Sequence, residues 1–223
     1  MPRATTRDLL LEHGALLYAR SGVNGVTSRQ LHQAVGARNE SALHYHFGSQ
    51  AGLVEAILRT HLDAVEARRR LLVNRLDDQG RRSVRALVHA LAQPMADDLA
   101  TAIGRAHLRI LDEVSHPELA FEPAFPGSLS RLGSDASAGA QMVAWLHEAL
   151  HHILPELPSA IRAERLAALR AQLIGGHAGR ARLLDEDRAP GGPASTTLFL
   201  ENLVDMASAA LSTPPSAATL AAL

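Results

Sequence analysis

Apolar residues recur along this chain at the three- and four-residue spacing of helices that face a common core. Serine or threonine precedes several of these segments and glycine or proline follows them, as expected of helix caps and stops. The predicted helices cover residues 5–21, 27–35, 50–76, 82–100, 102–115, 136–154, 158–187 and 195–212. A short further helix is expected between residues 39 and 47. The pattern therefore predicts an all-α chain.

The segment Thr27–Phe47 is predicted to form two short helices joined by a tight turn. Gly36 ends the first helix and Asn39 is expected to cap the second. Leu43 and Phe47, four residues apart, should face inward. The polar and small side chains left on the open side are Arg38, Asn39, Ser41, Ala42 and Tyr45. Such a face can read a DNA major groove, so we predict a helix-turn-helix, although an ordinary helical hairpin also has glycine turns.

Several short motifs between residues 6 and 58 occur together. They are Leu17-Tyr18 with Gly22, Val26-Thr27-Ser28, Ala34-Val35-Gly36, Leu43-His44-Tyr45-His46-Phe47, and Ser49 before Leu53-Val54. This series resembles the DNA-binding domain of the TetR family of transcriptional regulators. The match covers about a quarter of the chain, and the remainder carries no motif.

The resemblance implies which side chains contact DNA. The candidates are Ser28, Arg29, Arg38, Asn39, Glu40, Ser41, Ala42, His44, Tyr45, His46 and Gln50. The stretch from Gly36 to Phe47 is one residue longer than usual, so Arg38 and Asn39 could contact either a base or the backbone. Gln50 stands where the family often has lysine, which removes one phosphate contact. His44 replaces a tyrosine, and His46 could either enter the groove or pack inward.

The predicted domains are a DNA-binding head at residues 1–50, a body at 51–212 and a frayed tail at 213–223. The resemblance implies a homodimer through residues 158–187 and 195–212 and a palindromic operator. We expect a repressor that a small-molecule effector releases, with an activator as the open alternative. The apolar stripe expected to form a four-helix bundle between subunits is Leu166, Leu169, Leu173, Leu198, Leu203 and Met206.

An effector pocket is expected in the body, closed by a loop rich in proline, glycine and serine at 117–135. Its candidate lining is Met95, Ile103, His107, Ile110, Phe121, Phe125, Met142, Trp145 and His177. For any single one of these residues, an ordinary core role is favoured.

The distribution of charge gives modest support for phosphate contact by residues 1–50. The net charge is −1, which excludes a generally basic nucleic-acid coat, but residues 1–50 carry +2 and the remainder −3. Arg68, Arg69 and Arg70 are expected on the solvated side of the long helix. The chain has no cysteine, no signal-peptide pattern and no uncharged run near the ~18 residues that span a bilayer. We therefore expect a soluble, cytoplasmic protein without a membrane partner.

The twelve histidines raise an alternative, a helical metal- or ligand-sensing module that does not bind DNA. His147 and His151 have a spacing able to hold one metal ion, and His152 lies beside them. No cysteine or His-Glu-x-x-His motif supports a metal site, so ordinary surface or core histidines are favoured. No nucleophile elbow, phosphate loop or paired carboxylates indicate an enzyme, and no cofactor or metal is expected.

Overall fold

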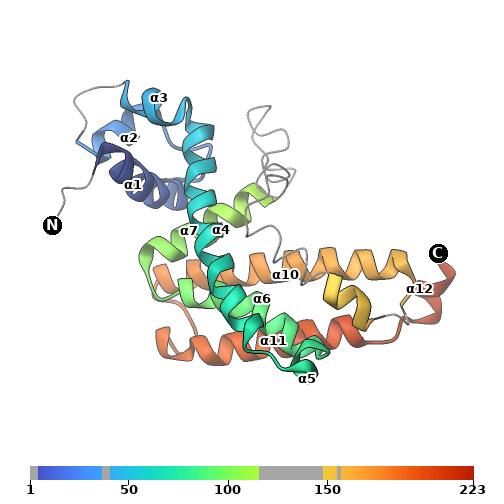
Figure 1. Cartoon of the computed structure of the whole chain (residues 1–223). Helices are drawn as coiled ribbons and strands as arrows, with labels where there is room; N and C mark the ends of the chain where they lie inside the picture. The colour runs from blue at the N-terminus through green and yellow to red at the C-terminus, as the bar shows by residue number, and fades with distance from the viewer. Residues whose placement is uncertain (1–4, 37–40, 116–147, 155–156) are drawn as a thin grey trace.

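A computed structural model describes residues 5–36, 41–115, 148–154 and 157–223, and every regular element among them is helical, as predicted (Figure 1). The helices are α1 (Thr6–Ser21), α2 (Ser28–Ala34), α3 (Ala42–Phe47), α4 (Gln50–Asn74), α5 (Asp78–Arg81), α6 (Val84–Asp98), α7 (Ala102–Ser115), α10 (Ser159–Asp185), η1 (Pro193–Ser195), α11 (Thr196–Ser212) and α12 (Ala217–Ala221). Residues 148–153 are also helical. None of the helices described is long and apolar enough to cross a membrane.

Local capping explains where the N-terminal helices begin and end. The Thr27 hydroxyl accepts from the Gln30 backbone N–H while the Gln30 side chain accepts from the Thr27 N–H, a reciprocal capping box at α2. The Ser49 hydroxyl caps α4. Gly22 ends α1 with a φ of +80°, and Gly36 follows α2 with a φ of +62°. Glycine adopts a positive φ without a Cβ penalty, which explains why each helix ends at a glycine. Both predicted stops are confirmed.

The start of α3 and the C-terminal tail differ from the prediction. The helix α3 begins at Ala42, and the predicted cap Asn39 lies outside the described residues. The tail is not wholly frayed, because the Ser216 hydroxyl caps the short helix α12. The loop predicted at 117–135 also lies outside the described residues.

The first of two hydrophobic cores joins α1–α3 and the beginning of α4 to α7. Its fully buried side chains include Leu10, Tyr18, Leu53 and Ile110. A Cβ on Gly14 would lie 3.1 Å from Leu53 Cδ2, so the close packing of α1 on α4 explains a glycine inside a helix.

The second core lies among the end of α4, α6, α10 and α11, with α4 running from one core to the other (Figure 1). Leu169, Leu173 and Leu203 of the predicted intersubunit stripe are buried here, and Leu166 packs against them. Leu198 and Met206 are 72% and 56% exposed. The prediction that Leu169, Leu173 and Leu203 face a second subunit was therefore wrong, because these side chains are already buried within their own chain.

The prediction for the arginine run on α4 was also wrong. Arg69 is buried, forms an ion pair with Glu66, and donates from Nε and Nη2 to the Leu91 carbonyl oxygen at 3.2 and 3.1 Å. Arg68 lies 2.6 Å from Asp98. Of the three arginines, Arg70 is the exposed one. The reason is that α6 packs across this side of α4.

Candidate nucleic-acid interface and effector pocket

The helix α3 is fixed to the first core by one face. Leu43 is buried and Phe47 is half-buried, as predicted. The Arg7 guanidinium lies 5.6 Å from the centre of the Phe47 ring and covers it. These contacts hold the short helix so that His44, Tyr45 and His46 are left on its exposed side.

The open face of α3 carries three adjacent side chains with rings. His44, Tyr45 and His46 are all exposed, and Tyr45 is 84% exposed. The Tyr45 and His46 rings meet edge-on with their centres 5.0 Å apart. The structure therefore places His46 outside the core, where its ring and the Tyr45 hydroxyl can meet a partner.

The start of α2 lies near the start of α4, and Gln50 joins them. In the side-chain orientation that gives hydrogen-bond partners to both the amide oxygen and the amide nitrogen, Gln50 donates to the Val26 carbonyl oxygen at 2.9 Å. It also accepts from the Ser28 backbone N–H at 3.1 Å and the Ser28 hydroxyl at 3.0 Å. Gln50 thus has a structural role that the sequence did not reveal, because its partners lie more than twenty residues away.

The other predicted DNA contacts differ in exposure. Ser28 and Arg29 are exposed in the first turn of α2, and Ser41 is exposed before α3. Ala42 is half-buried against the first core. Arg38, Asn39 and Glu40 lie outside the described residues. The helices α2 and α3 come together at one end of the molecule, remote from α5 and α11 (Figure 1).

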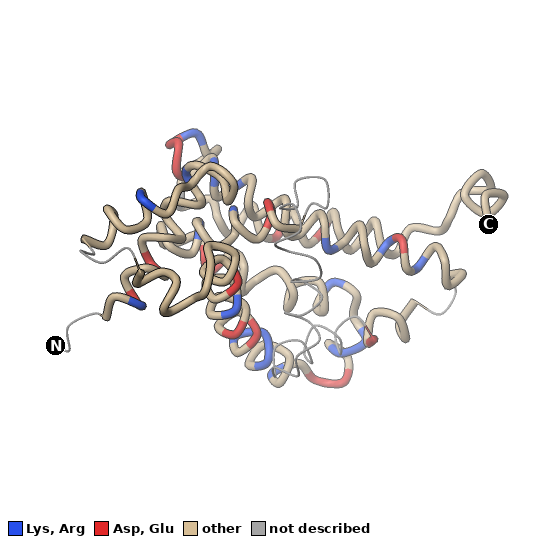
Figure 2. Tube along the Cα trace, turned by 90° about the horizontal axis from the view of Figure 1, so that it is seen from above, with Lys and Arg blue, Asp and Glu red and all other residues tan. Residues whose placement is uncertain are grey.

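Charge is not segregated over the part of the molecule that the structure describes. Figure 2 shows basic and acidic residues interleaved along the trace. Many are paired in the body, where Arg105 and Arg109 lie 2.5 and 3.1 Å from Asp185 and Arg182 lies 2.7 Å from Asp112. Any nucleic-acid binding must therefore depend on local contacts and not on an overall positive field.

Five of the predicted pocket residues lie among the described helices of the body. Met95 and Ile110 are buried in the first core, where Ile103 packs against them. His177 is fully buried and its Nδ1 lies 2.6 Å from the Leu173 carbonyl oxygen. The half-buried His107 ring lies 4.8 Å from that of His61. The remaining four candidates, Phe121, Phe125, Met142 and Trp145, lie outside the described residues.

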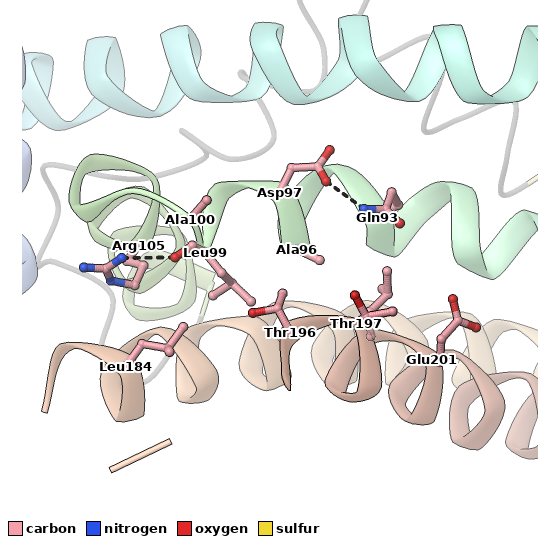
Figure 3. A pocket seen from close by; sticks show the side chains of 11 residues that line it. Gln93, Ala96, Asp97, Leu99, Ala100, Arg105, Leu184, Thr196, Thr197 and Glu201 are labelled. Carbon is pink, nitrogen blue, oxygen red and sulfur yellow. Dashed lines mark hydrogen bonds between the residues drawn. The ribbon is translucent and has the colours of Figure 1, made fainter. Parts of the chain in front are cut away.

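A groove of about 600 Å³ opens elsewhere, between α6 and α11 and beside the start of α7 and the end of α10 (Figure 3). Its lining is Gln93, Ala96, Asp97, Leu99, Ala100, Arg105, Leu184, Thr196, Thr197, Leu200 and Glu201. Figure 3 shows Leu99 and Leu184 toward the end that holds Arg105, and Gln93 and Glu201 toward the other end. Sequence reasoning missed this groove because four separate helices supply its lining and no motif marks it.

The charged groups of this groove already have partners within the chain. Glu201 pairs with Arg85 and lies 3.4 Å from His89, while Asp97 accepts from the Gln93 amide at 2.7 Å. Arg105 donates to the Leu99 carbonyl oxygen at 3.0 Å besides pairing with Asp185. The groove is therefore a partly apolar surface on which Arg105 and Glu201 already have ion-pair partners.

The histidines suggested as metal ligands are only partly among the described residues. His147 lies outside the described residues, and His151 and His152 are exposed, with ring centres 5.9 Å apart. Within the described part of the chain, no group of three or more histidines and carboxylates is arranged to hold a metal ion.

Comparison with known proteins identifies the fold. No protein-family model and no curated protein matches the chain. Among solved structures it is similar to the ketosteroid transcriptional regulator KstR2 of Mycobacterium tuberculosis, with a TM-score of 0.62 and 20% identity over 92% of this chain and 94% of that one. It is similar to the probable transcriptional regulatory protein RHA5900, with a TM-score of 0.58 and 23% identity over 93% and 100%. The TetR family transcriptional regulator PfmR from Thermus thermophilus gives a TM-score of 0.55 and 17% identity over 96% and 100%. The chain therefore has the fold of TetR-family transcriptional regulators.

Proposed function

We propose that this protein is a TetR-family transcriptional regulator that binds DNA through α2 and α3. The observation that carries the proposal is the exposed His44, Tyr45 and His46 face of α3, which Leu43 and Phe47 hold against the core. A helix fixed in this way offers rings and hydrogen-bonding groups to base edges in a major groove. The shared fold with three transcriptional regulators supports the same conclusion.

In this proposal the two helices have different tasks. The helix α3 enters the major groove with Tyr45 at its centre. Arg29, exposed at the start of α2, pairs with a backbone phosphate. Gln50 takes no phosphate, because its amide holds Ser28 and Val26 in place. Residues 1–50 then act as the DNA-binding head and residues 51–212 as the body, with α4 belonging to both.

The test measures DNA affinity at one fixed salt concentration, since phosphate contacts make binding salt-dependent. Tyr45→Ala and Arg29→Ala should each weaken operator binding by about 1–3 kcal/mol. Arg170→Ala, an exposed arginine on α10, serves as the matched control and should leave the affinity unchanged. If both head variants bind like the wild type, the assignment of this face to DNA is wrong.

We infer that the regulator acts as a homodimer formed by α10 and α11. Leu198 and Met206, eight residues apart on α11, remain exposed in a single chain, and burial against a second copy would remove them from water. A two-fold dimer presents two α3 helices to successive major grooves, so its operator is a near-palindrome. We propose repression as the regulatory outcome.

For the effector we propose the groove between α6 and α11. About 600 Å³ is ample for a small organic molecule, and the alanines and leucines of its lining favour an apolar body. A thermal-shift screen with small hydrophobic compounds should find stabilising molecules. Thr197→Trp would fill the groove with an indole ring, so it should abolish that stabilisation. Stabilisation that persists in this variant would place the ligand elsewhere, with Met95, Ile110 and His177 as the other candidate site.

A further inference from the structure

A side chain of α7 holds the loop that leads into the helix-turn-helix. Glu113 Oε1 accepts a hydrogen bond from the Val23 backbone N–H at 2.8 Å, across ninety residues of sequence. Val23 lies between α1 and α2, and its side chain is 1% exposed. A buried backbone N–H without a partner would be costly, so the carboxylate fixes both the position and the direction of this loop.

The neighbouring Gly22 leaves room for the Glu113 carboxylate. Gly22 has a φ of +80°, and a Cβ at this residue would lie 3.3 Å from Glu113 Oε1. A larger residue at position 22 would therefore be strained and would crowd the oxygen that binds Val23. The turn that ends α1 and the contact with α7 thus require the same glycine.

The helix α7 is also bound to α10. Asp185 pairs with both Arg105 and Arg109, and Arg182 pairs with Asp112. The same helix packs along α1 through the first core. Ion pairs thus join α10 to α7, and the Glu113 carboxylate joins α7 to the Val23 loop.

We propose that Glu113 is a positioning residue for DNA binding, which sets α2 and α3 relative to α7 without touching DNA. The inference rests on the proposed function, since it assumes that α2 and α3 meet DNA. The Glu113 contact is then one point at which a change in the body reaches the DNA-binding helices.

The first part of the test needs no DNA. Hydrogen exchange of the segment that contains Val23 is compared in the wild type, Glu113→Ala and Glu113→Gln. Alanine removes the acceptor, whereas glutamine keeps a carbonyl oxygen at Oε1. We expect about tenfold faster exchange in the alanine variant and protection close to wild type in the glutamine variant. Unchanged exchange in Glu113→Ala would overturn the proposal.

The second part measures affinity for the operator. Glu113→Ala should weaken binding by about tenfold, and Glu113→Gln should restore most of it. Ser83→Ala, which removes the cap of α6, lowers thermal stability without touching the loop and should leave the affinity unchanged. Equal losses in Glu113→Ala and Ser83→Ala, or no rescue by glutamine, would contradict a positioning role. A wild-type protein that binds no DNA would refute the proposed function and this role together, while the exchange result would still report on the contact.

Discussion

Burial keeps three histidines of this chain neutral. Desolvation lowers the pKa of His61 to about 3, with the nearby His107 adding to the effect, and lowers the pKa of His107 and of His177 to about 4. Each folded pKa lies below the ordinary value of 6.5, so the unfolded chain binds more protons between these values. The stability that these histidines contribute is therefore complete above about pH 6.5 and declines as the pH falls toward about 4.

His177 offers the clearest test of this linkage. Between about pH 7 and pH 5 the wild type should lose about 2 kcal/mol of unfolding free energy through His177, because its imidazole must stay neutral in the fold. In His177→Gln this part of the pH dependence should vanish, although the stability at neutral pH also falls. Urea unfolding at both pH values measures the difference. If the wild type and the variant lost the same unfolding free energy between these two pH values, His177 would not be the source of this pH dependence.

Some residue roles follow from local sequence and others do not. The inward positions of Leu43 and Phe47 follow from their spacing on one short helix, and the exposure of Tyr45 follows in turn. The bonds of Gln50 to Ser28 and of Glu113 to Val23 join residues far apart in the chain. No pattern along the sequence shows such contacts, because they depend on how the helices are packed.

At the scale of the element, α4 contains a buried ion pair. Glu66 and Arg69 lie one turn apart, and the Leu91 carbonyl oxygen of α6 receives two further N–H groups of Arg69. Burial is the main influence on Glu66 and raises the pKa of its carboxyl, against the effect of Arg69. The pair therefore needs both members, and α6 supplies the acceptor that makes burial of the guanidinium tolerable.

Arg69→Ala should lower the unfolding free energy by about 3 kcal/mol, because Glu66 would remain buried without its partner. Arg170→Ala, which changes an exposed arginine of α10, should cost less than about 0.5 kcal/mol. The double variant Glu66→Leu with Arg69→Met should recover most of the loss, since it removes both charges and keeps apolar volume. Chemical denaturation measures all three. A similar loss for Arg69→Ala and Arg170→Ala would contradict the importance of the pair.

The predicted helix boundaries were accurate where a cap or stop marks them, as at Gly22, Thr27 and Ser49. The burial of Arg69 was missed because its acceptor belongs to α6, and helical periodicity describes one helix at a time. The same reason explains the groove, whose lining comes from four helices. Capping depends on residues close together in the sequence, whereas burial and cavities depend on how several helices pack together.

At the scale of the whole molecule, two cores link the helices. One joins α1–α4 to α7, and the other holds α6, α10 and α11 together. The helix α4 takes part in both, and α7 contacts α1 as well as α10. This arrangement gives two routes by which a change near α10 and α11 can reach α2 and α3.

The proposed dimer has a direct test at this scale. Leu198→Glu combined with Met206→Glu places two charges on the exposed face of α11, so a dimer that buries this face should dissociate. Sedimentation velocity should show a dimer for the wild type and a monomer for the double variant. Leu71→Glu is the control, because Leu71 is also exposed and apolar but lies on α4. A dimer that survives the double variant would place the interface on another surface.

Whether this protein reads DNA with α3 can be measured by selecting binding sites from random double-stranded DNA. We expect the wild type to recover an inverted repeat whose half-sites lie about one helical turn apart, as expected of a two-fold dimer. Tyr45→Ala, tested on the recovered site, should bind about tenfold or more weakly at the same salt concentration. Recovery of no enriched sequence, or of a site that Tyr45→Ala binds as tightly as the wild type, would contradict DNA reading by α3.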